Sequence, residues 1–142
     1  MIEITELNQV GPVEIVQITA LMRELHDDDR TPTLEEAQKI LKNENVVVMV
    51  AREDERIVGV ATLYILQKFG KLSAHLEDVI VDEKNRGQGL GKKLVQAVID
   101  VAKKRGLHSI ALTSQPKRIA ANRLYVSLGF IKRETNAYKL TL

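Results

Sequence analysis

The sequence contains no cysteine. This absence excludes disulfide bonds, iron–sulfur clusters, thiolate zinc sites and cysteine nucleophiles together. The longest apolar run, Val46–Ala51, has six residues and is far too short to span a membrane. Residues 1–4 lack the basic start and the apolar stretch of a secretory signal peptide. We therefore expect a small cytoplasmic domain with no metal cofactor.

Aromatic residues make up only 4% of the chain, which leaves little surface on which nucleic-acid bases could stack. The formal net charge of +2 is too small to indicate a nucleic-acid-binding protein. Prolines number only three, and each stands where a helix or strand is expected to begin, so no linker is visible. The length of 142 residues suits one domain with its own core. We expect a single domain over residues 1–142 that binds neither nucleic acid nor membranes.

The hydrophobic pattern alternates between the periods of strands and helices. Thr33 followed by Glu36 has the form of a capping box that opens a helix. Gly106 and Gly129 are typical of left-handed residues after a helix, and Gly59 within an apolar run is a candidate β-bulge. These features predict a mixed α/β domain with helices on both faces of a sheet. The expected strands are residues 2–7, 46–52, 56–67, 73–81, 108–113, 130–131 and 138–142, and the expected helices are residues 12–25, 33–41, 90–105 and 116 or 117 to 128.

A glycine-rich turn joins a strand to a helix within residues 79–91. Gly87, Gly89 and Gly91 free the backbone for a tight turn and a close ligand. The unpaired N–H groups at the start of the next helix, with Arg86 and Lys92 beside them, suit a phosphate. An alternative interpretation is a glycine-rich turn that only starts a helix.

Two nucleotide motifs do not fit this turn. A Walker A loop would need glycine at position 86 and Ser or Thr at position 93, where the chain has Arg86 and Lys93. The third glycine of a dinucleotide fingerprint would fall on Lys92 or Leu94. The spacing that remains is Arg-x-x-Gly-x-Gly, at positions 86, 89 and 91.

A second motif lies about thirty residues further along. Asn122 and Tyr125 are three residues apart, so a helix presents them on nearly the same face. Leu128-Gly129-Phe130 follows. Taken alone, the pair would be a capping asparagine and a core tyrosine with one hydrogen bond.

Together the two motifs resemble the GNAT superfamily of acetyl-CoA-dependent N-acetyltransferases. Residues 74–81 are also similar to the corresponding strand of glucosamine-phosphate N-acetyltransferases. The resemblance implies a single GNAT-like α/β domain, with a mixed, mostly antiparallel sheet, splayed central strands and helices on both faces. It implies acetyl transfer from acetyl-CoA to a primary amine of a small molecule or peptide, by direct attack in a ternary complex. A CoA-binding or partner-binding module without turnover is the alternative, and a homodimer is expected by analogy only.

The resemblance also implies roles for particular residues. The cofactor's pantetheine arm would pair with β-strand backbone as an added strand, and Asn122 would contact it. The Val79 N–H is the candidate donor to the thioester oxygen. Tyr125 is the candidate acid for the departing thiolate. The backbone expected to hold the cofactor is Val79, Ile80 and Val81 for pantetheine, and Arg86, Gly87, Gln88, Gly89, Leu90, Gly91 and Lys92 for the pyrophosphate.

Glu77 is the candidate base that takes a proton from the amine. The alternative is a salt-bridged edge carboxylate, and His75 shares its face of the strand. Asp78 is predicted to point to the other face unless a bulge reverses the alternation. The run 27–29 of three aspartates either attracts a cationic amine or forms a solvated break between helices, and we prefer the break. The sequence does not identify the acceptor.

Overall fold

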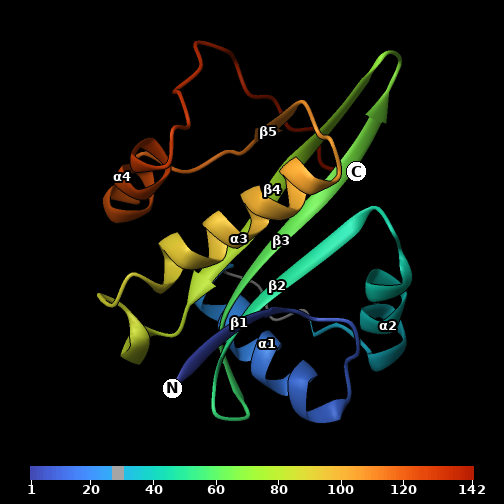
Figure 1. Cartoon of the computed structure of the whole chain (residues 1–142), viewed down its shortest axis with the longest axis vertical. Helices are drawn as coiled ribbons and strands as arrows, with labels where there is room; N and C mark the ends of the chain where they lie inside the picture. The colour runs from blue at the N-terminus through green and yellow to red at the C-terminus, as the bar shows by residue number, and fades with distance from the viewer. Residues whose placement is uncertain (27–30) are drawn as a thin grey trace.

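A five-stranded sheet in the order β1-β2-β3-β4-β5 runs through the part of the chain that the structure describes (Figure 1). The structure is a computed structural model that describes residues 1–26 and 31–142. Neighbouring strands are antiparallel except for β4 and β5, which are parallel. The predicted mixed, mostly antiparallel sheet is confirmed. The strands are β1 (Ile2–Glu6), β2 (Val46–Glu53), β3 (Arg56–Lys68), β4 (Lys71–Val81) and β5 (Ser109–Ala111).

Helices pack on both faces of this sheet. The predicted cap of the second helix is present, since the Thr33 hydroxyl accepts the Glu36 backbone N–H at 3.1 Å. Gly106 and Gly129 have φ of 72° and 97° and end two helices as predicted. None of the described helices is long and apolar enough to cross a membrane. The helices are α1 (Pro12–Leu25), α2 (Leu34–Lys42), α3 (Leu90–Lys104) and α4 (Ile119–Ser127), with the 3₁₀ turn η1 (Glu83–Asn85) before α3.

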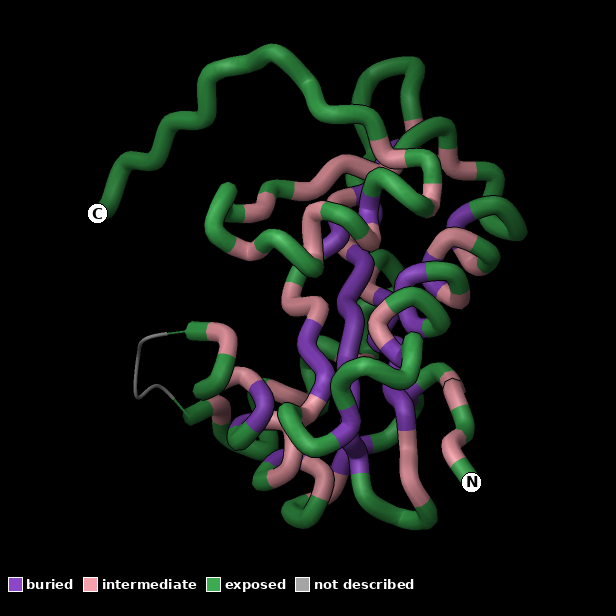
Figure 2. Tube along the Cα trace, turned by 90° about the vertical axis from the view of Figure 1, so that its left-hand side faces the viewer, coloured by how far each residue is buried: buried purple, intermediate pink, exposed green. Residues whose placement is uncertain are grey.

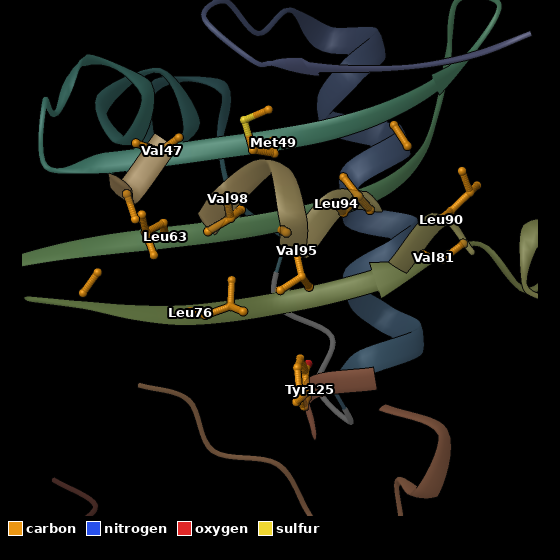
Figure 3. Close-up of a cluster of buried hydrophobic side chains, with 14 of the residues drawn as sticks. Val47, Met49, Leu63, Leu76, Val81, Leu90, Leu94, Val95, Val98 and Tyr125 are labelled. Atoms are coloured by element: carbon orange, nitrogen blue, oxygen red, sulfur yellow. The ribbon is translucent and has the colours of Figure 1, made fainter. Parts of the chain in front are cut away.

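The core lies in two layers, one on each face of the sheet. Leu94, Val95 and Val98 of α3 are fully buried against β2, β3 and β4 (Figure 3). On the opposite face, Leu21 of α1 packs with Val48, Val50, Ile57 and Val60. Each such side chain contributes roughly 1.5–3 kcal/mol when it leaves water. Buried residues accordingly follow the central strands, and exposed residues follow the loops and helix surfaces (Figure 2).

Gly59 marks a bulge in β3, as predicted. Ala51 pairs with Gly59 but Arg52 pairs with Ile57, so Val58 is an extra residue in the ladder. A Cβ on Gly59 would lie 2.8 Å from Leu94 Cδ1. Glycine is therefore needed here for the close approach of α3 to the sheet.

The prediction of two C-terminal strands was wrong. Residues 130–131 and 138–142 are irregular, and Tyr138, Leu140 and Leu142 are exposed on a segment that leads away from the body of the molecule (Figure 2). Their alternation with Lys139 and Thr141 has the period of a strand, but a strand also needs a neighbour to pair its backbone groups. β5 is likewise shorter than the predicted 108–113, because its pairing with β4 ends at Ala111.

Candidate active site

β4 and β5 are paired at one end only. The parallel pairs are Ser73 with Ser109, Ala74 with Ile110 and His75 with Ala111. Past His75, β4 continues to Val81 without a partner in β5. A cleft opens between this part of β4 and the segment 112–121. The predicted splay of the central strands is thus present, and it exposes strand backbone to which an extended ligand can bind.

The cleft brings most of the predicted site residues together. Gln88 and Asn122 are the two predicted residues outside its lining. The predicted residues that line it are Glu77, Val79, Ile80, Val81, Arg86, Gly87, Gly89, Leu90, Gly91, Lys92 and Tyr125.

The glycine turn forms one end of the cleft. Gly87 and Gly89 have φ of 79° and 78°, a left-handed conformation that glycine adopts without strain. Gly89 is the N-cap of α3, and the first N–H bonded within the helix is that of Lys93, to the Gly89 carbonyl at 3.1 Å. A Cβ at Gly91 would lie 3.1 Å from Leu124 Cδ1, so this glycine lets α4 pack close to α3. The N–H groups that open α3 form a site suited to an anion.

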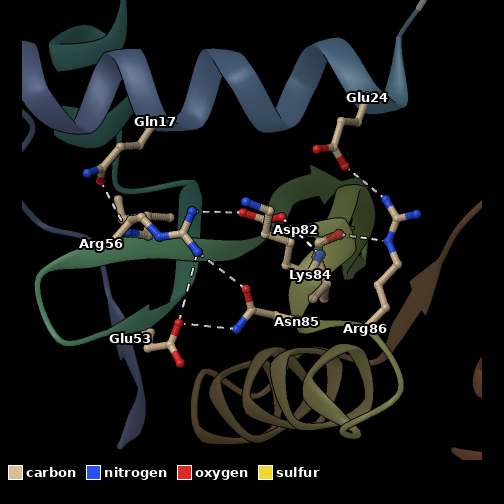
Figure 4. A network of polar contacts seen from close by, with 10 residues as sticks. Gln17, Glu24, Glu53, Arg56, Asp82, Lys84, Asn85 and Arg86 are labelled. Atoms are coloured by element: carbon tan, nitrogen blue, oxygen red, sulfur yellow. Dashed lines mark hydrogen bonds and ion pairs between the residues drawn. The ribbon is translucent and has the colours of Figure 1, made fainter.

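A polar network fixes the connector before this turn (Figure 4). Arg56 Nη1 donates to Asp82 Oδ2 at 3.0 Å, and Asp82 Oδ1 caps η1 by accepting the Lys84 N–H at 3.1 Å. The buried Asn85 donates to Glu53 at 3.4 Å and accepts from Arg56 at 3.5 Å. These contacts tie the connector to the β2–β3 hairpin, so the glycine turn has a fixed base.

The Arg86 side chain turns toward α1. Its Nε donates to the Val81 carbonyl and its Nη2 donates to Glu24 Oε2, both at 2.9 Å (Figure 4). The guanidinium therefore links the end of β4 to α1. Lys117 and Arg118, which were not among the predicted site residues, also line the cleft and add positive charge to that of Lys92. Their position shortly before the motif of Asn122 and Tyr125 could have identified them from the sequence.

A second bulge interrupts β4 at the middle of the cleft. Val60 pairs with Ile80 but Thr62 pairs with Glu77, so Asp78 and Val79 both lie opposite one residue of β3. Asp78 has φ of 55°, in the left-handed region. The bulge reverses the alternation, since Val79 packs in the α3 layer and Ile80 packs in the α1 layer. The prediction that Asp78 points to the opposite face from Glu77 applies only to a strand without a bulge. Because β4 has a bulge here, that prediction does not apply.

Two histidine–carboxylate pairs result. Asp78 Oδ1 lies 2.9 Å from His26 Nε2, at the end of α1, and Glu77 Oε1 lies 3.0 Å from His75 Nε2 on the same strand. Both carboxylates and His26 line the cleft. Burial, and then the negative charges of Asp78 and Glu77, raise the pKa of Tyr64 on the neighbouring strand. This end of the cleft is therefore acidic. Sequence reasoning did not place His26 or Tyr64 in the site, because the contact of His26 with Asp78 is made only in the folded chain.

Tyr125 closes the cleft from α4. Its buried ring meets Phe130 edge-on, with centroids 5.8 Å apart. Burial raises the pKa of its hydroxyl, and the positive charge of Arg118 opposes that rise. The net direction is upward, so the hydroxyl keeps its proton at neutral pH and can donate it.

Asn122 braces the turn before α4. Its Nδ2 donates to the Gln115 and Arg118 carbonyls at 3.0 and 2.9 Å. These bonds hold the turn but are not a helix cap, because a capping side chain accepts a backbone N–H and Asn122 lies inside α4. The contact of Asn122 with a pantetheine arm stays a prediction. The aspartate run 27–29 lies outside the described residues.

Comparisons with known proteins agree with this geometry. The family model for the acetyltransferase (GNAT) family matches residues 14–130. A glucosamine 6-phosphate N-acetyltransferase of Trypanosoma brucei brucei is 39% identical over 82 residues, covering 56% of this chain and 54% of the relative. A probable glucosamine 6-phosphate N-acetyltransferase 2 of Oryza sativa subsp. japonica is 32% identical over 94 residues, covering 61% and 55%. The chain thus matches about half the length of these curated relatives.

Among solved structures, similarity extends over the whole chain. An aminoglycoside acetyltransferase from an uncultured soil metagenomic sample, in complex with sisomicin, superposes with a TM-score of 0.89 and 25% identity. The match covers 99% of this chain and 96% of that one.

Proposed function

This chain belongs to the GNAT acetyltransferase family, and from that premise we propose that it transfers the acetyl group of acetyl-CoA to a primary amine of a small molecule or peptide. The amine nitrogen attacks the thioester carbonyl carbon directly in a ternary complex, the C–S bond breaks, and CoA leaves as the thiol. The observation that carries the proposal is the cleft beside the part of β4 that β5 does not pair. The start of α3 lies at one end of this cleft and two carboxylates lie at the other.

The start of α3 would hold the pyrophosphate of the cofactor. Its unpaired N–H groups and the positive end of the helix dipole favour an anion. Lys92, Lys117 and Arg118 add the charge that a polyanionic ligand needs. The pantetheine arm would then follow Val79 to Val81 toward the middle of the cleft.

The bulge in β4 would polarise the thioester. A bulge leaves backbone groups of its extra residue without a ladder partner. The Val79 N–H at this bulge is our donor to the oxygen that becomes negative as the carbonyl turns tetrahedral. Tyr125 would donate to the sulfur as it leaves.

The acidic end of the cleft would receive the amine. Glu77 and Asp78 lie there, and their charges favour a cationic acceptor. One carboxylate would take the amine's proton, and Glu77 is the one that the sequence predicts. Glucosamine 6-phosphate and sisomicin are the first acceptors to try, because a relative and a structural neighbour carry them in their names.

A thiol-release assay with acetyl-CoA and an amine panel tests the proposal. The panel would contain glucosamine 6-phosphate, sisomicin, spermidine and a lysine peptide. Because the chain has no cysteine, every thiol detected comes from CoA. We expect amine-dependent release with at least one acceptor. CoA binding without release for any amine would instead support the non-catalytic module. The cytoplasmic location and the homodimer stay predictions.

A further inference from the structure

The hydrogen bond between His26 and Asp78 joins the two walls of the acceptor end of the cleft. His26 follows the last residue of α1, and Asp78 lies in β4. Their atoms Nε2 and Oδ1 are 2.9 Å apart, and both residues line the cleft. These residues are 52 positions apart in the sequence, so their contact is made by the fold and not by local geometry.

The backbone of Asp78 has an unfavourable conformation at this contact. Its φ of 55° lies in the left-handed region, where residues other than glycine are uncommon and Asp and Asn are the best tolerated. The bulge in β4 keeps it there. A backbone outlier beside a cleft is a reason to ask what its side chain does.

We propose that Asp78 accepts the proton of the acceptor amine and that His26 is a positioning residue that holds the Asp78 carboxylate through their hydrogen bond. This inference rests on the acetyl transfer proposed above. The ammonium group gives one proton to Asp78, and the nitrogen lone pair then attacks the thioester carbon. As the C–S bond breaks, the thiolate takes a proton from Tyr125. The nitrogen then loses its second proton, which returns to the Tyr125 phenolate. Asp78 releases its proton to solvent.

Asp78 fits this task better than Glu77 does. The Asp78 side chain is 24% exposed and Glu77 is 46% exposed, so Asp78 is the more shielded carboxylate. Glu77 is paired with His75 along its own strand. The titratable or charged groups nearest Asp78 on these elements include Tyr64 on β3, His75 and Glu77 on β4, and Arg23 and Glu24 on α1, of which Glu24 is paired with Arg86.

Asp78→Asn tests the base. Asparagine tolerates the same φ and can keep a hydrogen bond, but it cannot accept the proton. We expect kcat/KM for the best amine to fall about 10²-fold to 10⁴-fold at pH 7. The deficit should shrink about tenfold per pH unit as the pH approaches the pKa of the amine, because more acceptor then arrives neutral. CoA affinity, measured by calorimetry, should be unchanged.

His26→Ala and His26→Gln test the positioning role. The glutamine amide can still donate to the Asp78 carboxylate, whereas alanine cannot. We expect His26→Ala to lower kcat on the order of tenfold and His26→Gln to restore most of it. Asp54→Asn is the matched control for the backbone, since Asp54 also has φ of 55° but lies in the β2–β3 turn.

Unchanged kcat/KM in Asp78→Asn, or a deficit that does not vary with pH, overturns the assignment of the base. Equal kcat in wild type, His26→Ala and His26→Gln overturns the positioning role. If the wild-type protein releases no CoA with any amine, the proposed function fails and this inference fails with it. Wild-type turnover with an insensitive Asp78→Asn overturns this inference alone.

Discussion

Gly89 lies at the end of the cleft where we propose that the cofactor binds. Its φ of 78° places the first turn of α3 so that the unpaired N–H groups open into the cleft. A Cβ there would meet no protein atom within 4 Å, so a side chain would project into the open space that we propose for the pyrophosphate. A larger residue at this position should therefore weaken ligand binding and also strain the backbone.

Gly89→Val should weaken CoA binding by tenfold or more, since misplaced contacts typically have effects of at least this order. Calorimetry with CoA measures it. Gly70→Val is the matched control, because Gly70 has φ of 70° and equally open space in the β3–β4 turn, far from the glycine turn. Equal CoA affinity in both variants would place the pyrophosphate elsewhere.

Tyr125→Phe should lower kcat by about 10², the low end for a lost proton donor, because a thiolate is a good leaving group. CoA affinity should stay close to that of wild type, since the ring still packs against Phe130. Steady-state kinetics and calorimetry together measure the split. Full turnover in Tyr125→Phe would return Tyr125 to a purely structural role.

The raised pKa of Tyr125 also gives a pH prediction. A phenol whose pKa lies above its usual value of about 10 keeps its proton through neutral and mildly alkaline pH. Deprotonation of Tyr125 should therefore cause no loss of rate below about pH 10, so wild type and Tyr125→Phe should have the same pH dependence over that range. A pH–rate profile of both proteins measures it. A wild-type decline well below that pH that is absent in the variant would mean that the Tyr125 pKa is lowered, not raised.

At the scale of elements, the bulge in β3 sets the distance between α3 and the sheet. A methyl group at Gly59 would lie 2.8 Å from Leu94 Cδ1 and 3.4 Å from Ala51 Cβ. Gly59→Ala should lower the free energy of unfolding by about 1–3 kcal/mol, as overpacking does. Urea denaturation measures it. Gly11→Ala, where the nearest atom would be 3.7 Å away, should cost well under that. An unchanged midpoint in Gly59→Ala would mean that α3 moves freely.

The elements that the sequence predicts well are those whose own residues decide them. The helix at 12–25 was predicted with its observed bounds, because Pro12 starts it and its apolar face is continuous. The glycine turn and the start of α3 were also predicted from the sequence, because glycine spacing indicates left-handed residues before a helix. By contrast, 138–142 has a strand pattern without a partner in the described chain, and pairing cannot be read from one segment.

The orientation of the carboxylates in the cleft likewise could not be predicted from local sequence. Glu77 could be placed by alternation, but the left-handed Asp78 reverses the alternation after it. No local signal at Asp78 requires that conformation. The pairing of Asp78 with His26 depends on where α1 ends relative to β4, which only the packed structure decides.

At the scale of the whole molecule, β5 is joined to the sheet by fewer residue pairs than the other strands are. β1 to β4 form successive antiparallel pairs along their length, whereas β5 is tied to β4 by three residue pairs. α4 follows β5, so Tyr125 and the far wall of the cleft depend on that short connection and on packing against α3.

This unequal connection has a consequence for hydrogen exchange. Local opening free energies within one protein range from near zero to that of global unfolding, and thinly paired segments lie at the low end. Amides of β5 and α4 should exchange faster than those of β2 and β3 in the free protein, and saturating CoA should slow them. Equal protection throughout would indicate one cooperative unit. If the difference is found, the wall formed by β5 and α4 can open by itself, and the CoA that we propose to bind there can enter and leave while β1 to β4 stay paired.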